Sequence, residues 1–398
     1  MNLLFYSAPV VLSNDAFNAV GLAVKNLIGG SYFGWAWRTP AVQRMKQRMK
    51  RQTHVGTLAS RGASNHGEIA LQCEILGLLQ QGCVGRCALM DEEWAAVEQQ
   101  VFVRGGLLLL CGDGPGRSKC LGAKGPNNFS THPCPYCMVE QVDDDTGGDL
   151  GNPQFDIDKN KRTWGQITGG FSELEALADN PGAQALRSKE LGLVPPDASG
   201  LPLPLYSAMR VVPTDHVPVE RLHFDALGQC QLCQVFCLEL LSTKGRRLVS
   251  AIMAQESSLL YPPGTQKLKD IVTNYSSLTG SDKWTLQSIM PLVYRMVLQD
   301  VPAMRTNMKK RDINILKAEW GTYEMVLDAL RKLIQNVSLL SFAVRAPSYT
   351  EVELKQLDLL ARDVVGVFSS VLGRTGSRPT IHSILHTVEA IRLHGEYA

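Results

Sequence analysis

The chain has 398 residues, of which 44% are hydrophobic and 20% charged, with a formal net charge of +2 and a mean hydropathy of −0.05. These values are those of a globular protein and exclude a disordered or fibrous chain. No apolar run approaches the roughly 18 residues of a membrane span, which excludes a membrane protein. Ten cysteines in a chain of this length do not indicate a small disulfide scaffold; their spacing is typical of metal ligands or of burial in a reducing compartment.

The first part of the chain is predicted to alternate strands and helices. Residues 1–12 are apolar and weakly alternating, which favours a buried strand over a signal peptide, and a second apolar stretch covers 32–37. Apolar residues recur at helical spacing over 66–79, and 92–101 also has a helical pattern. Residues 106–111 resemble a short buried strand. We therefore expect an α/β layer in the first 150 residues.

The remainder is predicted to be loop followed by helix. Residues 143–204 are rich in Gly, Pro, Asp and Asn, so a mostly irregular segment is expected there. Long helical patterns with few glycines then follow over 222–240, 268–301 and 312–342, and the last amphipathic run is 381–393.

Positive charge is concentrated near the amino terminus. No acidic residue lies between Asp15 and Glu68, and the segment also contains Trp35 and Trp37. This composition suits contact with phosphate groups and base stacking, although a solvated helix surface would have the same charge. The residues that we expect to contact DNA are Arg38, Arg44, Lys46, Arg48, Lys50 and Arg51.

Two short motifs contain metal-ligand residue types at suitable spacing. Cys134 and Cys137 form a C-x-x-C in a proline-rich turn, which can present two thiolates to a tetrahedral ion, although redox pairs and packed cysteines share this spacing. His382 and His386 are four residues apart, so a helix would place both on one face. Together the four predict a Cys2His2 site. His132 and Cys120 are the rival ligands.

Two further groups are candidates for catalysis. Asp113 directly follows the predicted strand 106–111, at the sheet edge where ligands and metals bind in α/β proteins, although a turn aspartate would occupy the same place. Glu220 and His223 are three residues apart at the start of a predicted helix and could act together on a phosphate or a leaving group. Cys230, Cys233 and Cys237 follow on one helical stripe, which favours core packing.

The order of these motifs resembles that of the CACTA (En/Spm-like) superfamily of DNA transposases. The matching positions include Gly112-Asp113-Gly114-Pro115, the C-x-x-C, Glu220 with His223 in place of D-x-x-H, Leu227-Gly228 and the H-x-x-x-H. The resemblance implies an α/β, ribonuclease H-like mixed sheet interrupted by a large, mainly helical insertion. The implied parts are a core over 1–142, an insertion over 143–375 and a return to the core over 376–398.

The resemblance also implies a chemistry. A zinc ion would be held by the Cys2His2 set, as in the related V(D)J recombinase, and three carboxylates would hold two Mg²⁺ or Mn²⁺ ions for strand cleavage and transfer. Asp113 matches the second carboxylate. The first is expected near Ala8, where Asp15 is the nearest acid, and the position of the third lies beyond Ala398. DNA, a homo-oligomer and the nucleus are the implied partners and location.

We therefore expect a transposase-derived protein that binds DNA and whose catalytic set is incomplete. The alternative is a non-catalytic, zinc-stabilised DNA-binding or interaction protein in which Asp113 is structural. A third hypothesis is a zinc hydrolase that uses His223 and Glu220.

Overall fold

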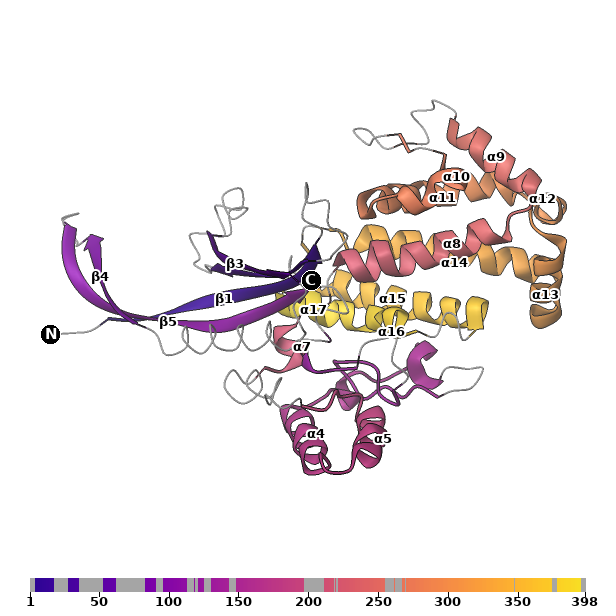
Figure 1. Cartoon of the computed structure of the whole chain (residues 1–398). Helices are drawn as coiled ribbons and strands as arrows, with labels where there is room; N and C mark the ends of the chain where they lie inside the picture. Colours follow the sequence, from indigo (N-terminus) through magenta and orange to yellow (C-terminus); the bar gives the residue numbers. More distant parts are fainter. Residues whose placement is uncertain are drawn as a thin grey trace. The chain divides into compact units, whose positions relative to one another are not determined.

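The computed structural model describes the backbone of five strands between residues 4 and 112 and, with side chains, the residues of the later chain (Figure 1). The latter are 118, 121–124, 130–142, 148–196, 211–217, 219, 221–254, 261, 267, 268, 270–346, 348–373 and 378–393. The chain divides into two compact units, one formed by residues 1–138 and 160–218 and the other by 139–159 and 219–398.

The strands of the first unit are β1 (Leu4–Phe17), β2 (Ile28–Trp35), β3 (Thr53–Arg61), β4 (Cys83–Met90) and β5 (Ala96–Gly112). Their backbones pair in the order β3-β2-β1-β5-β4, with β1 and β5 parallel and the other pairs antiparallel. The same unit contains α4 (Trp164–Ala176), α5 (Pro181–Leu191) and α7 (Pro213–His216). Thr163 and Gln166 form a capping box at α4, and Gly192 ends α5 in the left-handed conformation at φ 67°.

The second unit is helical. Its longer elements are the π-helix η3 (Leu222–Cys230), α8 (Gln231–Leu240), α9 (Thr243–Ala254), α11 (Gly280–Val297), α12 (Val301–Asn307), α13 (Lys310–Trp320), α14 (Tyr323–Ala343) and α15 (Glu351–Leu372). Its short elements are η1 (Gly148–Gly151), α10 (Ile271–Asn274), η4 (Tyr275–Ser277), α16 (Pro379–His382), η6 (Ser383–His386) and α17 (Thr387–His394). Another short turn, η2, covers Asp158–Asn160.

Helix α14 forms the centre of this unit, because it packs against both α11 and α15 (Figure 1). Its side chains Leu330, Leu333, Val337 and Leu340 are fully buried, and they recur at the spacing of one helix face. Phe368 of α15 is fully buried as well. Removing such apolar side chains from water is the main favourable contribution to the stability of this unit.

The predicted fold class is wrong. Among the residues whose side chains the structure describes, 74% are helical and 3% are in strands, and these residues form no sheet. A ribonuclease H-like α/β fold interrupted by a helical insertion does not fit this composition. One reason is local: the helix predicted over 92–101 lies largely within the 17-residue strand β5, so the expected alternation of strands and helices fails there. The helix predicted over 66–79 lies outside the described residues.

Predictions for the later chain were more accurate. The helical patterns over 222–240, 268–301 and 312–342 correspond mainly to helices, and 381–393 is helical too. The loop prediction for 143–204 is wrong in part, because α4 and α5 lie within it, and α15 was not predicted. Within the described part of the chain, no helix combines the length and the apolar character required to cross a membrane.

A buried carboxylate connects three helices of the second unit. Asp225 of η3 is fully buried, and its Oδ2 accepts hydrogen bonds from Trp284 Nε1 of α11 at 2.6 Å and Ser341 Oγ of α14 at 2.9 Å. Its Oδ1 accepts from Gln229 Nε2 at 2.8 Å and Cys230 Sγ at 3.1 Å. Burial and the neighbouring Asp225 raise the pKa of Cys230 well above its usual value, so this thiol stays protonated and donates.

We expect Asp225→Asn to lower the free energy of unfolding by roughly 2–4 kcal/mol, because the amide nitrogen would face hydrogen-bond donors in a dry core. Urea unfolding followed by circular dichroism measures the change. Asp328→Asn, at an exposed position of α14, is the matched control and should be close to neutral. Equal stability of the two variants would contradict the assigned role.

Candidate metal centre

The two cysteines of the C-x-x-C lie in a tight loop of the first unit. Cys134 is 3% exposed and Cys137 is fully buried. The backbone N–H of Tyr136 donates to Cys134 Sγ at 3.4 Å, so the loop bends around this sulfur. An isolated antiparallel bridge pairs Cys137 with Lys161, and Arg162 N–H donates to Tyr136 O at 2.9 Å. The loop is therefore held by the segment that precedes α4.

A buried guanidinium fixes the backbone of this loop. Arg162 is 5% exposed, and its Nε donates to Cys134 O at 2.9 Å and to Cys137 O at 3.2 Å. Its two terminal nitrogens donate to Leu191 O at 3.0 Å and His132 O at 2.8 Å. The forked shape of Arg allows one side chain to serve several carbonyls at once.

The two histidines lie in the second unit, where α16 continues into the 3₁₀ turn η6. Pro379 begins α16 and Arg378 precedes it in extended conformation. His382 is fully buried and His386 is 3% exposed, and their ring centroids are 5.3 Å apart at an interplanar angle of 73°. The edge of Phe155 packs against His382 with a centroid distance of 5.3 Å. The ring of Phe155 and the turn from α16 into η6 thus keep the two imidazoles next to each other.

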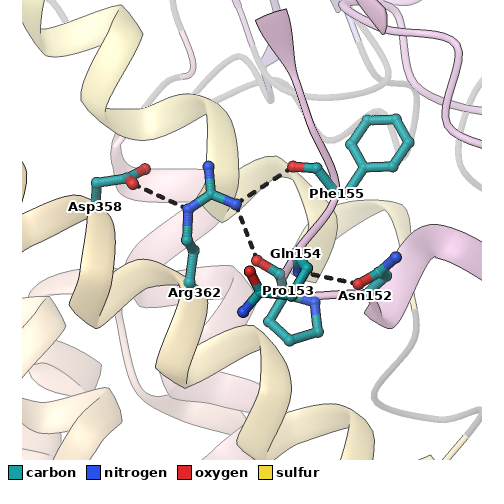
Figure 2. Close-up of polar contacts among 6 residues, drawn as sticks. All are labelled: Asn152, Pro153, Gln154, Phe155, Asp358 and Arg362. Atoms are coloured by element: carbon teal, nitrogen blue, oxygen red, sulfur yellow. Dashed lines mark hydrogen bonds and ion pairs between the residues drawn. The ribbon is translucent and has the colours of Figure 1, made fainter. Parts of the chain in front are cut away.

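The segment that carries Phe155 is held in turn by α15, as Figure 2 shows. Arg362 donates from Nη1 to Pro153 O at 2.9 Å and to Phe155 O at 3.3 Å. Its Nε donates to Asp358 Oδ2 at 2.9 Å, which orients the guanidinium. Asn152 Oδ1 accepts from the Gln154 N–H at 2.9 Å and closes the turn. These contacts give the ring that packs on His382 a fixed backbone.

The four candidate ligands form one group. The ligand atoms of Cys134, Cys137, His382 and His386 all lie within 4.8 Å of one another, and all four residues are buried. Two thiolates and two imidazoles are a ligand set that zinc prefers. These side chains can therefore hold a metal such as zinc, as predicted. Within the described residues, the rival His132 is not part of this group, and Cys120 lies outside them.

The other predicted site residues are not brought together in the described structure. Asp113 and Glu220 lie outside the described residues, as do all six basic residues predicted to contact DNA, Arg38, Arg44, Lys46, Arg48, Lys50 and Arg51. Asp15 lies in β1, in register with Gly30 of β2. His223 is half-buried in η3. The catalytic predictions for these residues stay predictions.

Three residues that support the site were not predicted from the sequence: Arg162, Phe155 and Arg362. Each contacts either a residue far away in the sequence or a backbone carbonyl oxygen. Contacts of these kinds leave no recognisable motif in the sequence. Compared with known proteins, the chain matches no protein-family model and no curated protein.

Arg162→Lys should weaken zinc binding about 10–100-fold, because a lysine keeps the charge but has too few donors, all on one nitrogen, to serve the four carbonyls that Arg162 serves. Competition with a chromophoric zinc chelator gives the affinity. Arg187→Ala is the control: Arg187 is half-buried on α5 and pairs with Glu173 and Glu190, outside the group of candidate ligands, so its loss should leave zinc affinity unchanged. If Arg162→Lys folds and binds zinc as tightly as the parent chain, the supporting role of Arg162 is disproved.

Proposed function

We propose that the chain is a zinc-stabilised DNA-binding protein derived from a transposase of the CACTA superfamily. The Cys2His2 group carries the proposal. The resemblance implied that a C-x-x-C and an H-x-x-x-H far apart in the sequence would share one ion, and the ligand atoms of these two motifs lie within 4.8 Å of one another. Random pairs of cysteines and histidines at such sequence separation would rarely meet in this way.

The composition of the group favours a structural ion over a catalytic one. Structural zinc sites are closed by four protein ligands, whereas catalytic sites use three and keep one position for water. All four residues here are buried, which leaves little access for a substrate. His223 is not part of the group, so the arrangement gives no support to a zinc hydrolase that uses His223 and Glu220.

The DNA-binding part of the proposal rests on the charge pattern of the first unit. The segment between Asp15 and Glu68 contains basic residues and no acidic ones, and this charge suits contact with phosphate groups. A protein of this kind would act in the nucleus. The proposal does not include Mg²⁺- or Mn²⁺-dependent strand cleavage, since that chemistry depends on carboxylates such as Asp113 that lie outside the described residues.

The purified chain should contain one equivalent of zinc, and Cys134→Ser should lose most of it. The free energy of unfolding should fall by roughly 2–5 kcal/mol, because the binding energy of a structural zinc is part of the folding energy. Metal content is measured by mass spectrometry of the elements and stability by thermal unfolding. Cys237→Ala removes another buried thiol outside the group and should keep the zinc. Absence of zinc from the parent chain would overturn the proposal.

Combined replacement of Arg44, Lys46 and Arg48 by Ala should weaken binding to duplex DNA. The slope of log K against log salt should become shallower by about 2–3, because each lost phosphate contact removes about 0.9 from it. Fluorescence anisotropy with a labelled duplex at several salt concentrations measures both quantities. If the parent chain binds no duplex DNA, the DNA-binding part of the proposal is wrong; an unchanged slope would remove only this segment from it.

A further inference from the structure

A basic pocket lies in the second unit and is lined by residues that the candidate metal centre does not use. It is formed by α12, α13 and the start of α14, and its volume is about 390 Å³. The polar side chains that line it include Arg305, Lys310, Asn314 and Tyr323. Among the described residues that line the pocket, none is acidic. The pocket is therefore positively charged.

An aromatic ring organises the positive charges. The Arg305 guanidinium carbon and Lys317 Nζ each lie 4.9 Å from the centroid of the Tyr323 ring, within the range of cation–π interaction. The Tyr323 hydroxyl donates to Asn314 Oδ1 at 2.7 Å, which fixes the ring relative to α13. Two cations from two helices are thus held beside one side chain.

These charges are not neutralised within the described part of the chain. Arg305, Lys310 and Lys317 are exposed, and none of them forms an ion pair with a described carboxylate. In this segment the described ion pair joins Lys309 to Asp312 at 3.9 Å. Cations gathered at one place repel each other, and a bound anion would relieve this repulsion. The pocket therefore has the charge, the donors and the space for a phosphate group.

We propose that this pocket binds phosphate groups of a nucleic-acid backbone. The inference rests on the proposed DNA-binding function and assigns it a second surface, on the helical unit. Exposed Arg and Lys side chains beside an aromatic ring are typical of nucleic-acid contacts, in which cations meet phosphates and rings meet sugars or bases. Arg311, which follows Lys310 on α13, is exposed as well.

The experiment compares two triple variants of the full chain. In the pocket variant, Arg305→Ala, Lys310→Ala and Lys317→Ala are combined. In the control, Lys189→Ala, Lys332→Ala and Lys355→Ala remove the same net charge from exposed positions on α5, α14 and α15. Anisotropy with a labelled 20-base-pair duplex is measured across a salt series, and zinc content and circular dichroism verify that each variant is folded.

The pocket variant should bind at least about tenfold more weakly at low salt, with a slope shallower by about 2–3, and the control should change far less. Equal losses of DNA affinity in the two variants would show that only net charge matters and would overturn the inference. An unchanged salt slope in the pocket variant would overturn it too. In both cases the proposed function would stand. No DNA binding by the parent chain would overturn both. Sedimentation with phosphatidylserine vesicles provides a further arm: loss of vesicle binding alone in the pocket variant would assign the pocket to a membrane surface instead.

Discussion

Two thiols and two imidazoles are buried within 4.8 Å of one another, and this arrangement constrains the rest of the candidate site. One divalent cation can bind all four side chains at once, which requires that they be held close together. The surrounding structure matches this requirement on each side. Arg162 holds the carbonyls of both cysteines, and Phe155 packs on His382 from a turn that Arg362 secures. The backbone of the cysteine loop and the ring beside His382 are therefore both fixed by protein contacts.

The interior of the second unit also contains buried polar groups, which hold helices together instead of forming a candidate metal site. Asp225 accepts hydrogen bonds from donors on η3, α11 and α14, so a single carboxylate fixes the relative position of three helices. Apolar packing alone tolerates small rotations of a helix, whereas a carboxylate with four donors does not. Burial and the charge of Asp225 raise the pKa of the Cys230 thiol, and a hydrogen bond with Cys237, together with burial, raises the pKa of Cys233. Cys230 and Cys233 therefore pack in the core as protonated thiols.

Features that depend on residues close together in the sequence could be predicted, whereas features that depend on contacts between distant residues could not. The ligand motifs are short and contain reactive residue types, so Cys134 and His382 were recognisable, and helical periodicity identified the block that contains α11 and α14. The helix prediction for residues 92–101 was wrong because helical spacing over ten residues does not exclude a strand. Strand β5 depends on its pairing with β1 and β4, which the local sequence does not show. Arg162 could not be predicted, since its partners are backbone carbonyls that any sequence supplies.

The π-helix at Leu222–Cys230 has a consequence for how this part of the chain can change. Three successive residues of this element, Phe224, Asp225 and Ala226, are buried, so the helix is packed against protein on more than one face. Gly228 lies so close to Thr380 that a methyl group there would be 2.9 Å from the threonine Cγ2. Loss of one residue from this turn would rotate the carboxylate away from the indole of Trp284. Evolution should therefore conserve the length of this turn together with Asp225 and Gly228.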